Sequence, residues 1–263
     1  MSNYFDNYEK LFHNYRGKKI TFVEIGILDG GSLSMWREYF GPNARIIGID
    51  VNSKCKEFEK GGKFEVIIGD QGRPEFWNSL KESFRIDLLL DDGGHTNKQQ
   101  INTLIGGLDL INDGGKIVIE DTHTSYQPSF GNPSKYSLIH FVKRCIDDIH
   151  MRFNEDPSNL IAKNIHSIEI FESMICFNID RTKCQKNSRV YNMPTGLNSD
   201  RRYHDYKILS RFDDLSVKFN FLKKSKIFRF LRKFGVSLLI NLRTRSEGRE
   251  LNRHLKARLN QTN

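Results

Sequence analysis

The chain has 263 residues, a formal net charge of +9 at pH 7 and 38% hydrophobic residues. That length supports one full-sized core, and the composition is too apolar for a disordered chain and too polar for a membrane protein. No uninterrupted apolar run of about 18 residues is present, so we expect no spanning helix. The N-terminus lacks the basic and apolar regions of a secretory signal, and four cysteines without CxxC spacing favour a reducing cytoplasm over a disulfide framework or zinc site.

The positive charge is concentrated at the C-terminal end. Residues 218–263 hold 13 basic and 2 acidic residues, a net charge of +11. The remaining chain holds 28 basic and 30 acidic residues, a net charge of −2. Because the body is nearly neutral, the pI of about 9.3 is no argument for a nucleic-acid-binding face, and we expect no nucleic-acid partner.

The first 50 residues predict a helix, a strand, a glycine loop, a second helix and a second strand. Tyr4, Tyr8, Leu11 and Tyr15 share one helical face, which predicts a short helix within residues 1–18. An apolar run at 20–25 predicts a strand that ends at glycine. Residues 32–40 then predict a helix with Ser32 as its N-cap, and residues 45–50 predict the next strand.

The same alternation continues along the chain. Residues 64–70, 86–92 and 116–121 predict strands, and residues 52–60, 73–83, 96–111 and 135–150 predict helices. Nearly continuous apolar strands that alternate with helices indicate an α/β fold with a parallel sheet, covered by helices on both faces. Residues 166–171 and 173–179 predict a hairpin at the sheet edge. This body, residues 1–180, is followed by a polar excursion at 181–217 and a basic amphipathic segment at 218–263.

A glycine-rich loop follows the first strand, with Gly26 and Gly30 before Ser32. Glycine lets the backbone approach a ligand closely, and the N-terminus of the following helix favours an anionic group. The spacing differs from the G-x-G-x-x-G of dinucleotide-binding proteins. The alternative is an ordinary strand–turn–helix without a ligand.

Acidic residues stand in or at the ends of successive strands. Glu24 suits a ligand with an ammonium group, Asp50 is placed to hold two ribose hydroxyls, and Asp70 is within reach of a ring amino group. Asp91, at the end of the fourth strand, joins this cofactor-binding set. The acids of the first three strands, Glu24, Asp50 and Asp70, are in register and favour a nucleoside cofactor over solvent-exposed strand ends.

A second group of acids follows the later strands: Asp92, Glu120 and Asp121. Neighbouring parallel strands carry their carboxyl ends to one edge, so these side chains are expected to converge. Packed carboxylates need a cation or protons, and an all-oxygen site suits Mg²⁺. The alternative is helix capping, with Asp92 and Thr96 starting the helix at 96–111.

Two histidines lie beside these acids. His95 is three residues after Asp92, and His123 follows Asp121 by two. An unperturbed histidine changes charge near neutral pH, so either side chain is suited to take a proton from a hydroxyl. We predict His95 as the catalytic base and keep His123 as the substitute.

The strings FVEIGILDGGSLSMWREYFGPNARIIGID, IDLLLDDGGH and GGKIVIEDTHTSY resemble the metal-dependent sugar O-methyltransferases of macrolide biosynthesis, the mycinamicin and tylosin type, and related proteins that modify bacterial polysaccharide sugars. The resemblance covers roughly residues 4–180. It implies a Rossmann-like class I methyltransferase fold, with a seven-stranded, mostly parallel sheet and a reversed final strand. It implies S-adenosylmethionine as cofactor and Mg²⁺ or a similar divalent cation.

The resemblance also assigns roles. Glu24 and Gly26 would line the methionine part of the cofactor, and Asp50 would hold its ribose. Asp92, Glu120 and Asp121 would bind the metal, and His95 would be the general base. One departure is Gly94, where a serine is usual in the family. The implied reaction is methylation of a hydroxyl on a nucleotide-linked sugar or a surface glycan.

Other functions fit parts of the same pattern. The acid cluster would chelate a catechol-like phenol as well as a sugar diol, and an NAD-dependent oxidoreductase shares the sheet topology but would want the absent G-x-G-x-x-G. A non-catalytic cofactor-binding module gives no reason for the acids beside His95.

The basic segment supports one further expectation. Between Phe219 and Leu238 the apolar residues follow helical spacing with basic residues on the flanks, which is typical of a helix at an anionic membrane surface. We expect a cytoplasmic enzyme with peripheral contact at the inner membrane face. The alternative is that the apolar stripe packs on the body or on a second subunit of a homo-oligomer.

Overall fold

The computed structural model describes residues 3–131, 134–152 and 159–185, with single positions between 238 and 253. The chain divides into two compact units, residues 1–189 and 190–263, and the fold is described for the first. Apart from residues 181–185, the expected polar excursion lies outside the described residues, as does the basic segment apart from those single positions. The boundaries at 180 and 217 stay predictions.

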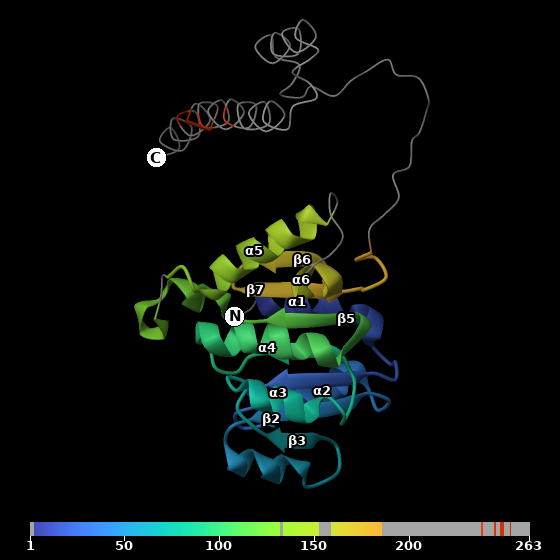
Figure 1. Ribbon diagram of the computed structural model, residues 1–263. Coiled ribbons are helices and arrows are strands. Elements are labelled where there is room, and N and C mark those ends of the chain that lie inside the picture. The colour runs from blue at the N-terminus through green and yellow to red at the C-terminus, as the bar shows by residue number, and fades with distance from the viewer. Residues whose placement is uncertain are drawn as a thin grey trace, which may run out of the picture. The chain divides into compact units, whose positions relative to one another are not determined.

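The core of the first unit is a seven-stranded sheet with the order β3-β2-β1-β4-β5-β7-β6 (Figure 1). Strands β1 to β5 are parallel, and β7 runs antiparallel to both of its neighbours. The reversed final strand is therefore confirmed. The strands are β1 (Thr21–Ile25), β2 (Arg45–Asp50), β3 (Glu65–Ile68), β4 (Ile86–Asp91), β5 (Ile111–Ile119), β6 (Ile165–Phe171) and β7 (Met174–Ile179).

Helices cover both faces of this sheet. The helices are α1 (Asn3–Phe12), α2 (Gly31–Phe40), α3 (Pro74–Leu80), α4 (Asn97–Leu110), α5 (Leu138–Met151) and α6 (Leu160–Asn164). Side chains of α1 and α2 share one buried cluster with the sheet, and those of α3 to α6 share the other. In Figure 1, α4 and α5 lie in front of the sheet and α1 lies behind it. Neighbouring strand residues alternate between the clusters, as Phe22 and Val23 do, which explains the nearly continuous apolar strands.

Three expected elements differ in detail. The expected helix at 52–60 is the 3-10 turn η2 (Ser53–Glu59). Helix α2 starts at Gly31 with Gly30 as its N-cap, so the prediction of Ser32 as the cap is wrong. The Ser32 hydroxyl instead donates a hydrogen bond to Glu24 Oε2, at 2.7 Å. Strand β5 already begins at Ile111, where the predicted helix had its last residue, because the chain pairs there with Ile86.

Aromatic packing fixes the N-terminal helix to the sheet. Helix α1 and the short turn η1 (His13–Tyr15) occupy the predicted N-terminal helical region. The ring of Phe12 lies 6.2 Å from that of Phe22 in β1, and the ring of Tyr8 lies 4.9 Å from that of Trp36 in α2. Such ring pairs contribute about 0.5–1.5 kcal/mol beyond their buried area. This packing holds α1 against the strands that end at the candidate site.

The sheet order creates a crevice at the carboxyl ends of β1 and β4. The chain proceeds from β1 to β2 on one side and reaches β4 and β5 on the other, so β1 and β4 are neighbours at the point where the order reverses. In open parallel sheets ligands bind in such a crevice. Within the described residues, no helix has the length and apolar character needed to cross a membrane.

Candidate functional site

A pocket of about 450 Å³ opens at this crevice. Its wall includes Gly26 after β1, Asp50 at the end of β2, and Asp92 and His95 after β4. The glycine loop, the acid expected to hold the ribose (Asp50) and the first residue of the acid cluster (Asp92) therefore lie in the wall of one cavity. Glu24, Gly30, Ser32 and Asp70 do not line it.

Close backbone packing between the β1 and β4 loops requires glycine at position 26. Gly26 has φ +83°, and a Cβ there would lie 2.2 Å from the Asp92 carbonyl oxygen. The Asp92 N–H in turn donates to the Ile25 carbonyl, at 3.0 Å. Gly26 thus allows the loop that begins at Asp92 to pack directly against the end of β1.

Glu24 is buried behind the glycine loop at 3% exposure. One carboxylate oxygen accepts from Ser32 Oγ at 2.7 Å and the other from Trp36 Nε1 at 3.0 Å. Burial raises the pKa of Glu24 to about 7, the two hydrogen bonds oppose the shift, and the charge of Asp92 adds to it. A cationic group beside Glu24 would relieve this cost. Gly30, the N-cap of α2, has φ +77° and packs against the ring of Phe58 in η2.

Asp50 and Asp70 have different surroundings. The Asp50 carboxylate accepts from the backbone N–H groups of Ile27, Leu28 and Asn52, at 3.1, 3.3 and 2.8 Å, so it holds the glycine loop while it lines the pocket. The Asp70 carboxylate accepts from the Gly72 N–H at 2.8 Å and pairs with Arg73 at 3.4 Å. The pocket wall after β3 is formed by Gly69 and Gln71 instead.

Asp91 lies below the pocket as part of its scaffold. It is 2% exposed, burial raises its pKa, and both carboxylate oxygens accept from Gln71 Nε2, at 2.8 and 2.9 Å. Gln71 Oε1 accepts from the Gly94 N–H at 2.9 Å, and Asp91 accepts from the Gly93 N–H at 3.1 Å. Gln71 thus shapes the loop that carries His95. Sequence reasoning missed it because a glutamine after a strand has no distinctive pattern.

Gly94 stands where the resemblance led us to expect a serine, and the end of the Gln99 side chain of α4 lies against this position. A Cβ at position 94 would lie 2.0 Å from Gln99 Nε2. Gln99 Oε1 also accepts from the Thr96 hydroxyl at 2.6 Å in the capping box that starts α4. The capping alternative therefore holds for Thr96, and Asp92 takes no part in that cap.

Three side chains converge at the pocket rim. Donor atoms of Asp92, His95 and Asp121 all lie within 4.8 Å of one another, and His95 Nε2 is 3.5 Å from Asp121 Oδ2. Partial burial and the charge of Asp121 raise the pKa of Asp92 to about 6. Asp121 has φ +50°, which is uncommon for a residue other than glycine and is often found at functional sites.

Glu120 lies next to this group and is nearly enclosed. It is 2% exposed, and its carboxylate accepts a short hydrogen bond from the Tyr8 hydroxyl. Burial raises the pKa of Glu120 to about 9, and the charges of Asp92, Glu24 and Asp121 add to the rise. The side chain is thus electrostatically coupled to the other acids, but it is outside the group of converging donor atoms.

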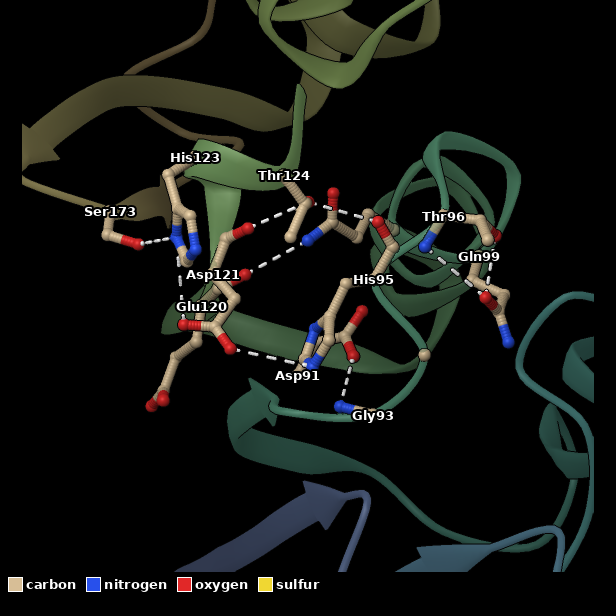
Figure 2. A network of polar contacts seen from close by, with 12 residues as sticks. Asp91, Gly93, His95, Thr96, Gln99, Glu120, Asp121, His123, Thr124 and Ser173 are labelled. Carbon is tan, nitrogen blue, oxygen red and sulfur yellow. Dashed lines mark hydrogen bonds and ion pairs between the residues drawn. The ribbon is translucent and has the colours of Figure 1, made fainter. Parts of the chain in front are cut away.

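The two histidines lie on opposite sides of the Asp121 carboxylate (Figure 2). His95 lines the pocket with a side chain that is 24% exposed, and its backbone carbonyl accepts from the Thr124 hydroxyl at 3.1 Å. His123 is 3.9 Å from Asp121 Oδ1 and 2.5 Å from Ser173 Oγ, and it does not line the pocket. Ser173, in the turn between β6 and β7 with φ +63°, is another residue that the sequence did not single out.

The donor set fits a hard divalent cation. Asp92 and Asp121 offer carboxylate oxygens beside the enclosed carboxylate of Glu120, and no lysine or arginine that the structure describes forms an ion pair with these three acids. Burial, and after it the charges of neighbouring acids, raise the pKa values of Asp92 and Glu120, and a bound cation would offset this cost. Oxygen-rich sites of this kind suit Mg²⁺.

Comparisons with known proteins agree with this geometry. No family model matches the chain. A tetracenomycin 2'-O-methyltransferase that methylates a rhamnosyl derivative, from Streptomyces olivaceus, is 30% identical over 54% of this chain and 40% of its own length. Mycinamicin VI 2''-O-methyltransferase from Micromonospora griseorubida is 29% identical over 64% of this chain and 46% of its own. This chain spans less than half the length of these relatives.

A solved structure shows the same architecture. The MycE methyltransferase from the mycinamycin biosynthetic pathway, in complex with Mg and SAH, has a TM-score of 0.63 at 25% identity and matches over 80% of this chain and 54% of its own. A second crystal form of that protein has a TM-score of 0.59. The sheet order, the reversed β7 and this likeness identify the fold as a Rossmann-like class I methyltransferase fold.

Proposed function

We propose that the chain is an S-adenosylmethionine-dependent O-methyltransferase that methylates a sugar hydroxyl with the help of Mg²⁺ or a similar divalent cation. The observation that carries this proposal is the convergence of Asp92, His95 and Asp121 at the rim of a pocket that Gly26 and Asp50 also line. The named relatives are O-methyltransferases of a rhamnosyl tetracenomycin and of mycinamicin VI, and the rhamnosyl group of the first favours a sugar acceptor.

In this proposal the pocket binds the cofactor. S-adenosylmethionine would supply an electrophilic methyl group when bound. Asp50 lines the pocket at the end of β2, in the position from which a carboxylate holds ribose hydroxyls. Glu24 lies under the glycine loop and would stabilise the ammonium group through its negative charge. Asp91 and Gln71 hold the shape of the loop that closes the other side.

Asp92, Glu120 and Asp121 would hold the cation. A bound divalent cation would lower the pKa of the acceptor hydroxyl and fix its orientation. The protein then has to remove one proton as the methyl group is transferred. His95 Nε2 is placed to accept this proton, since His95 lines the pocket and its Nε2 lies 3.5 Å from Asp121 Oδ2. Much of the rate would come from holding two reactants in one geometry.

His123 is the second candidate for the proton acceptor. Its Nδ1 is close to Ser173 and Asp121, so it too has a neighbouring acid. His95 is preferred because it lines the pocket, whereas His123 does not. Nitrogen is also a weaker ligand than oxygen for Mg²⁺, which leaves His95 free for proton transfer.

An acceptor screen tests the proposed function. The purified chain is incubated with S-adenosylmethionine and either sugar nucleotides and rhamnosides or catechols, each with EDTA and with Mg²⁺ added back. We expect methylation of a sugar hydroxyl that EDTA abolishes and Mg²⁺ restores. Methylation of catechols alone would instead support a phenol methyltransferase, and activity that is unchanged in EDTA would contradict the metal. A polysaccharide-linked sugar is part of the same proposal and belongs in the acceptor panel.

We also propose that the basic segment brings the enzyme to an anionic membrane surface in the cytoplasm. The support is the sequence pattern between Phe219 and Leu238, where apolar residues at helical spacing are flanked by lysine and arginine. Each basic residue near such a surface contributes about 1 kcal/mol. Salt-sensitive co-sedimentation with anionic vesicles, lost on deletion of residues 218–263, is expected. No sedimentation with vesicles, together with a deleted chain that forms fewer oligomers, would point to subunit packing.

A further inference from the structure

Two tyrosines of the N-terminal helix α1 direct their hydroxyl groups at the acid cluster. The Tyr8 hydroxyl donates to Glu120 Oε1, and the Tyr4 hydroxyl donates to Asp121 Oδ1 at 2.7 Å. In both pairs the partners are more than 110 positions apart in the sequence. The helical periodicity of residues 1–18 accounts for the aromatic rings, because they face the core, but it gives no reason for the hydroxyl groups.

Tyr8 reaches Glu120 from a fixed ring. The Tyr8 ring stacks on Phe12 at 6.0 Å and meets the Trp36 ring edge-on at 4.9 Å. Trp36 in turn donates its Nε1–H to Glu24, at 3.0 Å. Rings of α1 and α2 therefore present two neutral donors to two buried carboxylates. A phenylalanine at position 8 would keep the ring contacts and remove only the donor.

Tyr4 belongs to a second set of contacts around Asp121. Its hydroxyl is 3.0 Å from Ser173 Oγ as well as 2.7 Å from Asp121 Oδ1. Ser173 Oγ is also the partner of His123. The backbone carbonyl of Ser173 accepts from the Thr122 N–H at 3.1 Å, which ties the β6–β7 turn to the segment that carries Asp121. Asp121 is thus supported from α1 and from the hairpin.

We propose that Tyr8 and Tyr4 are positioning residues that orient Glu120 and Asp121 for the divalent cation, an inference that rests on the proposed function. Partners that hydrogen-bond to ligating carboxylates fix the orientation of the ligand atoms. A neutral hydroxyl is suited to this task because it occupies one lone pair and leaves the negative charge available to the cation. A lysine in its place would neutralise the carboxylate and compete with the metal.

Titration with Mn²⁺, followed by the electron paramagnetic resonance signal of the free ion, tests this on the full chain. Loss of such a partner typically weakens metal binding about 10–100-fold. We expect this loss for Tyr8→Phe and a smaller one for Tyr4→Phe, because the bond from the Thr122 N–H to the Ser173 carbonyl still holds the segment that carries Asp121. The matched control is Tyr15→Phe, which removes a hydroxyl that donates to the Gly114 carbonyl at 2.7 Å, away from the acids. It should bind Mn²⁺ like the unchanged chain.

A double-mutant cycle shows whether Tyr8 acts through Glu120. In a Glu120→Gln background the additional Tyr8→Phe change should weaken Mn²⁺ binding by much less than it does alone. In EDTA the melting temperatures of Tyr8→Phe and Tyr15→Phe should differ by only a few degrees, which shows that loss of stability does not cause the weaker Mn²⁺ binding. Wild-type affinity in Tyr8→Phe, or an equal loss in both backgrounds, would overturn the inference while the metal site stands. No Mn²⁺ binding by the unchanged chain would overturn the metal site and the inference with it.

Discussion

His95 and His123 are equivalent in sequence terms, since each closely follows an acid, but their surroundings differ. His95 faces the pocket, and its ring lies 6.2 Å from that of Phe130, whereas His123 lies against the hairpin turn at Ser173. The shared neighbour is Asp121, whose carboxylate oxygens lie 3.5 Å from His95 and 3.9 Å from His123. The pocket is what separates the two residues.

His95→Ala is expected to lower turnover about 10²–10⁴-fold, because proton removal loses its acceptor. Binding of S-adenosylhomocysteine should be largely kept, because Asp50 and the glycine loop, which are proposed to hold the cofactor, are unchanged. Steady-state kinetics and calorimetry measure the two effects. His123→Ala serves as the comparison and should retain much more activity. The reverse order of the two variants would assign the base to His123.

The pKa of Glu120 predicts how the stability of the metal-free chain depends on pH. The folded state raises this pKa from 4.5 to about 9, so the folded chain holds a proton that the unfolded chain has lost. Stability contributed by this site therefore falls as pH rises through that window. The melting temperature in EDTA should fall between pH 6 and pH 8.5, and Glu120→Gln should flatten the slope.

Added Mg²⁺ should also reduce that fall, because a cation replaces the proton. The matched control is Glu169→Gln, which changes a carboxylate that pairs with Lys10 and Lys116 and is away from the acid cluster. Its slope should equal that of the unchanged chain. If the melting temperature of Glu120→Gln fell with pH as steeply as that of the unchanged chain, groups other than Glu120 would produce the fall.

At the scale of the elements, the hairpin β6–β7 does two things. It completes the sheet beyond β5, and its turn brings Ser173 to His123 and Tyr4. The chain just after β7 is anchored by Arg181, whose guanidinium donates to the backbone carbonyls of Leu108 and Ile111, at 2.8 and 3.2 Å. It also donates to Asn164 Oδ1 at 2.7 Å. Arg181 therefore joins α4, β5, α6 and β7.

Arg181→Ala is expected to destabilise the fold by about 1–3 kcal/mol, since partly buried carbonyls lose a charged donor. Chemical denaturation measures this change. Lys183→Ala is the matched control: it removes a lysine two residues on, whose 2.7 Å ion pair with Asp180 is mostly exposed. Such pairs contribute about 0–1 kcal/mol. Equal losses in both variants would show that Arg181 does not anchor the hairpin.

For the whole molecule, binding of the cofactor product separates the candidate functions. A ligand that binds only the folded chain stabilises it by about 2.7 kcal/mol at a free concentration 100 times its Kd, which is about 5–10 °C in melting temperature for this size. S-adenosylhomocysteine with Mg²⁺ should produce such a shift and NAD should not. A shift with NAD alone would favour an oxidoreductase.

The sequence by itself determined the layers of the fold and the edge at which the site lies. Alternating apolar runs and helical periodicity are local properties. The strand ends they predict at residues 25 and 50 are those of β1 and β2, and the end they predict at residue 92 is one residue beyond that of β4. Because parallel strands carry their carboxyl ends to one edge, the acids at these ends had to be neighbours.

Only the tertiary structure decided which way each side chain turns. Glu120 and Asp121 are adjacent in sequence, but Glu120 faces Tyr8 of α1, while Asp121 faces the histidines. Asp70 turns to Arg73, and Gln71 takes its place in the pocket wall. These directions depend on partners that are distant in sequence, as with Tyr8 and Ser173, and no local pattern encodes them. Burial and neighbouring charges then set the free energy of ionisation. A carboxylate such as that of Glu120 ionises readily in water, but at a high cost when it is buried near three other acids.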